Sequence, residues 1–148
     1  MPVESDLAFF GLTFLDTSTE GAVVGENPEE TRRLQMLEDM VVDRFHEEGF
    51  TFLSNAPQRE QLDRIANPAK CYGCDQRIGA RLGADYVLVG EVQKVSNLIL
   101  AMNLQLRSVA DGALVAGRSV EIRSNTDDSW RRGMRYLLKT AIFEDAAG

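Results

Sequence analysis

Three segments in the second half of the chain carry the hydrophobic pattern of β-strands. Residues 83–90 place apolar side chains on both faces, as a central strand does. Residues 98–107 alternate apolar and polar side chains, which indicates a half-buried strand. Residues 113–123 follow the hairpin signal Asp111-Gly112, so the three segments predict an antiparallel meander. The residues expected on the buried face of the third strand are Leu114, Ala116, Val120 and Ile122.

The first half of the chain predicts a buried strand and a long amphipathic helix. Residues 7–15 form a short apolar run rich in phenylalanine, which favours a strand buried on both faces. Asn27 and Pro28 suit the cap and the first position of a helix, and Glu30 stands at the capping-box position. Apolar residues recur at helical spacing until Gly49, so we expect a helix that begins at Pro28 and ends before Gly49.

Shorter elements complete the fold. A short strand is predicted at residues 50–53. Proline and capping residues predict two short helices at residues 58–66 and 75–82, and a last helix that follows the capping residues 125–128. The order is β-α-β-α-α-β-β-β-α, which predicts a single α/β (α+β) domain over residues 1–148 with a mixed sheet of about five strands. We expect residues 1–6 to be disordered or added to the natural chain, and residues 144–148 to be a frayed tail.

Composition and charge exclude several classes of function. The chain has 148 residues, 44% hydrophobic and 26% charged, which is enough for a packed domain without metals or disulfides. A formal net charge of -7 and a pI near 4.7 argue against binding to nucleic acid or anionic lipid. Apolar runs stay far below the roughly 20 residues of a membrane-spanning helix, so we expect no membrane insertion.

The N-terminal residues leave the location of the protein open. Residues 1–6 are polar and acidic, so they are not a signal peptide as they stand. Two alternatives remain: the protein is cytoplasmic, or an export signal was removed and replaced by an initiator Met. Composition does not choose between them.

Two cysteines, Cys71 and Cys74, form a Cys-Tyr-Gly-Cys motif just before a predicted helix. A thiolate at a helix N-terminus is stabilised by the helix dipole, and two thiols at this spacing can form or exchange a disulfide. Four alternatives stay open: a local disulfide that fixes the loop, thiol exchange, metal binding, and inert thiols. Metal binding would need two more ligands, and the single histidine, His46, belongs to another predicted helix.

The loop after the first strand has some features of a calcium-binding loop. Asp16, Ser18 and Glu20 have the spacing of oxygen ligands, and Gly21 follows them. Asn27 stands where such a loop has its bidentate Glu, so a solvated loop is the favoured interpretation. These three residues are weak candidates for metal ligands.

The last predicted helix carries Arg131, Arg132, Arg135 and Lys139 in a chain that is acidic overall. Arg131, Arg135 and Lys139 are one helical turn apart and therefore form a basic stripe. This stripe is either a solvated helix face balanced by nearby carboxylates or a surface that binds a partner.

The central strand and its flanks carry a resemblance to known families. Residues 82–90, followed by a strand and an Asp-Gly hairpin, are similar to a module shared by the N-terminal domain of TolB and CsgG-type envelope proteins. More closely, residues 71–74, 93–100 and 124–133 resemble a bacterial family of unknown function. Its members are small, usually exported proteins, often encoded near quinoprotein alcohol dehydrogenases. The resemblance extends over nearly the whole chain and implies a periplasmic protein that contacts other proteins, with no catalytic residues to transfer.

We therefore expect a non-enzymatic periplasmic accessory or adaptor protein, without cofactors, that binds a protein partner in the cell envelope through the sheet edge and the basic helix. The resemblance implies a quinoprotein alcohol dehydrogenase system, and a homodimer through a sheet edge is compatible with the pattern. One alternative is a thiol-disulfide or redox-sensing protein that uses Cys71 and Cys74. Another is a protein that binds a small ligand or metal ion between the sheet and the loop of residues 16–27.

Overall fold

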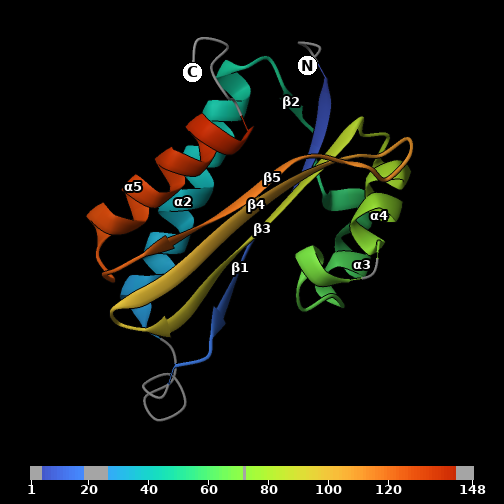
Figure 1. The fold of residues 1–148 in the computed structure, drawn as a ribbon. Coiled ribbons are helices and arrows are strands. Elements are labelled where there is room, and N and C mark those ends of the chain that lie inside the picture. The colour runs from blue at the N-terminus through green and yellow to red at the C-terminus, as the bar shows by residue number, and fades with distance from the viewer. Residues whose placement is uncertain (1–4, 19–26, 72, 143–148) are drawn as a thin grey trace.

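A mixed sheet of five strands organises residues 5–18, 27–71 and 73–142, the part of the chain that the computed structural model describes (Figure 1). The strands are β1 (Asp6–Asp16), β2 (Thr51–Phe52), β3 (Tyr86–Ser96), β4 (Ile99–Ser108) and β5 (Leu114–Ile122). Their order in the sheet is β2-β1-β3-β4-β5. β1 is parallel to both β2 and β3, whereas β3, β4 and β5 form an antiparallel meander. The predicted mixed sheet with its C-terminal meander is confirmed.

Helices cover the two faces of the sheet unequally (Figure 1). α2 (Pro28–Glu47) and α5 (Asp127–Leu137) lie side by side along one face. α3 (Arg59–Asp63) and α4 (Cys74–Leu82) lie over one end of the other face. Three single turns accompany them, η1 (Ala56–Gln58), η2 (Pro68–Lys70) and the π-helical η3 (Leu138–Ile142).

Side-chain caps start the two long helices. The Asn27 side chain accepts a hydrogen bond from the Glu29 amide at 2.9 Å, as predicted for the start of α2. At α5, the Thr126 hydroxyl accepts from the Ser129 amide and the Ser129 hydroxyl accepts from the Thr126 amide, both at 3.1 Å. This reciprocal capping box satisfies two amides that would otherwise lack partners.

The main core fills the space between the sheet and the pair α2 and α5. Trp130 and Phe45 are its largest fully buried side chains, and the Phe14 ring stacks on Trp130 with 6.0 Å between ring centroids. β4 contributes every second residue, as its alternation predicted: Leu100, Met102, Leu104 and Leu106. Burial of this apolar area is the main force that holds the two helices on the sheet.

The opposite face has a much smaller core, which lies beneath α4. Its buried members are Ala8, Ala84 and Val87. Gly79 allows α4 to approach β3 closely, because a Cβ at this position would overlap the Val87 side chain. Beyond this cluster, the centre of the sheet carries polar side chains on this face.

Three local predictions differ from the structure. Leu114 is 52% exposed, because the pairing of β4 with β5 slips between Leu106 and Arg107 and the extra residue reverses the side to which Leu114 points. The helix predicted at residues 58–66 is limited to α3, since it buries one residue, Leu62, and little apolar area holds its ends. Residues 5 and 6 were expected to lie outside the fold, but Ser5 is buried and β1 begins at Asp6.

Candidate functional site

The two cysteines are bonded to each other. Cys71 follows η2, Cys74 is the first residue of α4, and their Cα atoms are 5.4 Å apart. Gly73 adopts a left-handed backbone conformation with φ of +86°, which allows the sharp backbone turn between the two cysteines. Of the four alternatives for this motif, the structure has the local disulfide.

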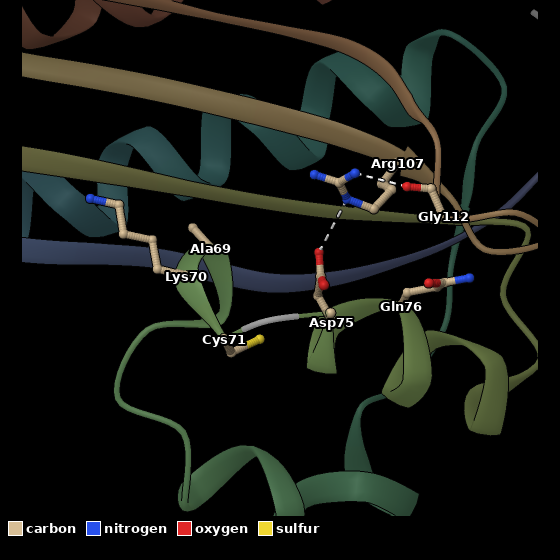
Figure 2. Close-up of a pocket in the computed structure, with 8 residues that line it drawn as sticks. Ala69, Lys70, Cys71, Asp75, Gln76, Arg107 and Gly112 are labelled. Carbon is tan, nitrogen blue, oxygen red and sulfur yellow. Dashed lines mark hydrogen bonds and ion pairs between the residues drawn. The ribbon is translucent and has the colours of Figure 1, made fainter.

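A cavity of about 320 Å³ is lined in part by Cys71 of this disulfide (Figure 2). Arg107 Nη1 donates to the Gly112 carbonyl at 2.8 Å, and Arg107 Nε lies 3.8 Å from the Asp75 carboxylate. On the other side of the cavity, Lys70 Nζ lies 3.6 Å from a carboxylate oxygen of Glu91. Each cation of the cavity therefore faces a carboxylate of the protein itself, which leaves little net charge to attract an ion.

Glu91 is a buried carboxylate at the centre of this polar face, only 3% exposed. Asn67 Nδ2 donates to Glu91 Oε2 at 2.6 Å, and Asn103 Nδ2 donates to Glu91 Oε1 at 3.0 Å. Asn67 also caps η2, so Glu91 fastens the segment before the disulfide to the middle of β3. Sequence reasoning missed this role because it ended the strand signal at Gly90, one residue before Glu91, whereas β3 continues to Ser96.

In the described part of the loop that resembles a calcium-binding loop, the predicted ligands form hydrogen bonds with each other. The Asp16 carboxylate accepts hydrogen bonds from the backbone amide and the hydroxyl of Ser18. Partial burial by itself raises the pKa of Asp16. The two hydrogen bonds from Ser18 and the positive charge of Lys94 together outweigh this effect, so the pKa of Asp16 is lowered. Glu20 lies outside the described residues. Within the described ranges, no three His, Cys, Asp or Glu side chains gather in a group that could hold a metal ion.

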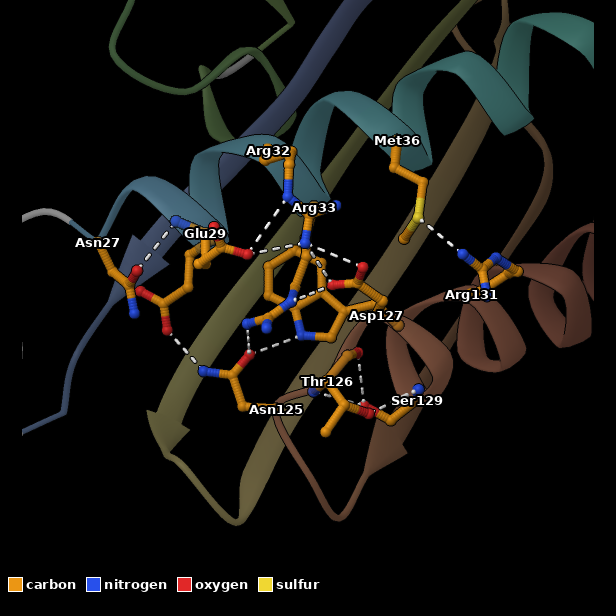
Figure 3. Close-up of polar contacts among 12 residues, drawn as sticks. Asn27, Glu29, Arg32, Arg33, Met36, Asn125, Thr126, Asp127, Ser129 and Arg131 are labelled. Carbon is orange, nitrogen blue, oxygen red and sulfur yellow. Dashed lines mark hydrogen bonds and ion pairs between the residues drawn. The ribbon is translucent and has the colours of Figure 1, made fainter.

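The four basic residues predicted for the last helix have different surroundings. The guanidinium of Arg131 lies between α5 and α2, with Nη2 3.5 Å from the Met36 sulfur (Figure 3). Arg132 pairs with Asp128 one turn earlier, and Arg135 and Lys139 are exposed. The first member of the predicted stripe therefore contacts the neighbouring helix, and the other two are exposed.

Asp127 joins the starts of α2 and α5 (Figure 3). Its carboxylate accepts from Arg32 Nη2 at 2.7 Å and from Arg33 Nε at 2.7 Å. The hydrogen bond from Arg32, together with that from Arg33, lowers the pKa of Asp127 to about 2. The first turn of α5 is thus tied to α2 by charge as well as by the core.

Beneath this joint lies a buried charge pair that the sequence did not reveal. Lys94 Nζ is 2.8 Å from Glu30 Oε2, and the two side chains are 5% and 2% exposed. Glu30 therefore turns toward the sheet, and its predicted role in a capping box is wrong. Asn125 Nδ2 donates to Glu30 at 2.6 Å, and Trp130 Nε1 donates to Asn125 Oδ1 at 2.8 Å. Residues 93–100 and 124–133, which carry the resemblance to a family of unknown function, meet in this network.

A groove of about 320 Å³ runs between α5 and β5. Its apolar wall consists of Val120, Ile122, Gly133 and Tyr136, and the Tyr136 side chain is 46% exposed. Arg123 and Arg132 lie among its polar lining residues. β5 is the last strand of the sheet, and among the described residues no strand pairs with its outer edge. We call this groove and edge the β5 margin.

Among the helices of the described residues, none is long and apolar enough to cross a membrane. Among curated proteins, none has a sequence that matches this chain.

Solved structures with a similar fold include two bacterial proteins of low sequence identity. The LpoB C-terminal domain from Salmonella enterica is 17% identical, with a TM-score of 0.59, and the alignment covers 84% of this chain and 86% of that chain. The lipoprotein GNA1162 from Neisseria meningitidis is 14% identical, with a TM-score of 0.54 and 83% coverage of both chains. At such identities these likenesses show the fold alone.

TolB from Acinetobacter baumannii aligns more weakly, with 14% identity, a TM-score of 0.49, and coverage of 94% of this chain and 29% of that chain. The predicted likeness to TolB thus has a matching structure, but one too distant to support an argument.

The sequence itself matches a family model, DUF3280, described as "Protein of unknown function (DUF2380)", over residues 5–142. The match extends over nearly the whole chain, in agreement with the expected resemblance to a family of unknown function. The chain belongs to this family.

Proposed function

We propose that this chain is a non-enzymatic accessory protein that acts by binding a protein partner through the β5 margin. The observation that carries the proposal is the open edge of β5 beside an apolar groove. A long edge strand is a natural place for another chain to pair, and proteins usually cover or interrupt such edges. Here no described strand pairs with the outer edge of the nine-residue β5, and an exposed aromatic side chain, Tyr136, lies next to it.

We further propose that the protein works in the periplasm. The disulfide Cys71–Cys74 supports this location, because disulfides form and persist in oxidising compartments. The resemblance described above supports an exported protein and a partner in a quinoprotein alcohol dehydrogenase system. Arg132, Arg135 and Lys139 would then add long-range attraction to an acidic partner, while Arg131 holds α5 to α2.

Site-specific photo-crosslinking in the source bacterium tests the proposal. A photoreactive phenylalanine at Tyr136 should give a discrete covalent adduct with one envelope protein, which mass spectrometry then identifies. The matched control is Val42, which is 36% exposed on α2, away from the β5 margin. Equal adducts at both positions, or none at Tyr136, would show that the β5 margin is not the binding surface. A partner unrelated to quinoprotein dehydrogenases would disprove only the narrower proposal.

Two alternative functions are separable from the first. A thiol-disulfide function is favoured by the position of the Cys71–Cys74 bond at a helix N-terminus. Replacement of both cysteines by serine should leave the Tyr136 adduct intact if the protein is an adaptor. Loss of function with an unchanged fold would support the thiol function instead. Binding of a small ligand or metal ion near Asp16 would raise the thermal unfolding temperature when that ligand or ion is added.

A further inference from the structure

We infer that the partner presents an extended acidic segment, which pairs with the outer edge of β5 as a sixth strand. The inference rests on the proposed function and specifies the chemistry of the partner. It combines three observations: the direction of the backbone groups of β5, the shape and composition of the adjoining groove, and the charge along the edge.

The register of the sheet shows which backbone groups of β5 are available. Leu104 lies opposite Arg118, and the Leu104 carbonyl oxygen points across to β5, where it approaches Gly117. In an antiparallel ladder, residues that exchange hydrogen bonds alternate with residues whose N–H and C=O point away. Arg118 therefore bonds to β4, and its neighbours Gly117 and Ser119 direct their backbone groups outward, to an added strand.

The groove supplies side-chain contacts beside this edge. Val120 and Ile122 project from β5, and Gly133 lets α5 approach, because a Cβ there would lie 2.9 Å from Ile122 Cγ2. Tyr136 forms the outer wall and is half exposed. Apolar side chains of an added strand, which project toward the same face at every second position, would lie against this wall.

The edge has a small excess of positive charge, with Arg118, Arg123 and Arg132 against Glu121 and Asp128, although the chain has a net charge of -7. Arg118 is exposed on β5 and, among the described residues, has no carboxylate within ion-pair distance. Arg123 and Arg132 line the groove, and each is paired with an exposed carboxylate. Exposed pairs of this kind are weak, so carboxylates of a partner can compete for both guanidinium groups.

The same charges argue against a second copy of this chain as the occupant. A twofold dimer places the same surface patch of two subunits together. Pairing of two β5 edges would therefore place the positive excess of this edge, three arginines against the two carboxylates Glu121 and Asp128, beside an identical positive excess. An acidic strand supplies carboxylates to Arg118 and competes with Glu121 and Asp128 for the other two arginines, whereas a second copy brings the same positive excess.

Fluorescence anisotropy with two labelled peptides tests the inference. The first is a nine-residue peptide that alternates Val with Glu, and the second carries Lys in place of every Glu. At low salt the full chain should bind the acidic peptide roughly tenfold more tightly than the basic one, and added salt should reduce this difference. Equal affinity for the two peptides, or binding of neither, would overturn the inference.

Three variants separate strand pairing from simple attraction. Ser119→Pro removes an outward N–H without breaking a bond to β4, so it should abolish peptide binding while the unfolding temperature stays close to that of the parent. Ser119→Ala keeps the N–H and should bind normally. Arg118→Glu should weaken the acidic peptide and strengthen the basic one. Undiminished binding by a folded Ser119→Pro variant would overturn strand pairing; if that variant does not fold, the Arg118→Glu reversal still decides the charge preference.

Failure of strand pairing can be distinguished from failure of the proposed function. A Tyr136 adduct that persists in the Ser119→Pro background would overturn strand pairing and leave partner binding by the β5 margin intact. A dimer of the parent chain in sedimentation equilibrium that Ser119→Pro abolishes would assign the edge to a second copy, and would overturn the inference.

Discussion

The two faces of β3 each bury an ionisable side chain, but they do so in different ways. On the face covered by α2 and α5, Lys94 pairs with Glu30, and both side chains are almost completely buried. On the face partly covered by η2 and α4, Glu91 is held by the amides of Asn67 and Asn103, and its nearest cation, Lys70, is 67% exposed. The first site is a closed ion pair, and the second is a carboxylate held mainly by neutral donors.

The comparison shows how the surroundings decide the role of a charge. A buried ion pair needs both partners, because removal of one leaves an uncompensated charge in a medium of low polarity. A buried carboxylate held by neutral amides depends on its hydrogen bonds instead, and loss of one acceptor leaves an amide donor without a partner. The first site should therefore fix the position of α2 on the sheet, and the second should fix the segment before the disulfide to β3.

The largest effect is expected for Lys94→Met. This change leaves Glu30 buried without a cation, which should reduce the free energy of unfolding by about 3–5 kcal/mol. Urea denaturation of the variant and the parent measures the difference. The double variant Glu30→Gln with Lys94→Met should recover part of the loss, because no unpaired charge remains. A loss below about 1 kcal/mol for Lys94→Met would mean that the pair behaves as an exposed one.

A smaller effect is expected for Glu91→Gln. The substituted side chain has one acceptor oxygen in place of two, so either Asn67 or Asn103 loses its partner, at a cost of about 1–3 kcal/mol. Lys70→Ala is the matched control, and it should change the free energy of unfolding by less than about 1 kcal/mol because its ion pair is largely exposed. If Lys70→Ala proved as costly as Lys94→Met, the contrast between the two faces would be wrong.

Replacement of Cys71 and Cys74 by serine tests how far the second face depends on its disulfide. The bond closes a very short loop, so chain entropy predicts a loss of about 2 kcal/mol. Hydrogen exchange should show faster opening of α4, while α2 and α5 remain protected as in the parent. Equal loss of protection on both faces would indicate a single cooperative unit instead of two halves of different stability.

The fold was predictable from the sequence to the extent that it depends on local patterns. The alternation in β4 and the caps of α2 and α5 depend on residues close together in the chain, and each is confirmed. Leu114 was misplaced because a bulge depends on pairing with the neighbouring strand.

The polar sites were less accessible to sequence reasoning. Glu30 and Lys94 are far apart in the chain, and only the packing of α2 on β3 brings them together. Glu30 had a satisfactory local explanation as part of a cap, so the sequence held no signal for a buried pair. The β5 margin was anticipated only as a sheet edge, since its groove requires the position of α5 relative to β5.

The smallest effect is expected at the surface link between α2 and α5, and it depends on pH. Arg32 and Arg33 lower the pKa of Asp127 from 3.8 to about 2. A carboxyl whose pKa is depressed in the folded state contributes stability above its unfolded pKa and loses that contribution as the pH falls through the folded value. Asp127→Asn should therefore lower the unfolding temperature by a constant, small amount above about pH 5, and this difference should shrink as the pH falls from 4 toward 2. Thermal unfolding of both proteins across this range measures it, with Asp128→Asn as a control that leaves the link to α2 in place. A difference that does not depend on pH would mean that Asp127 holds the helices by shape alone and not by charge.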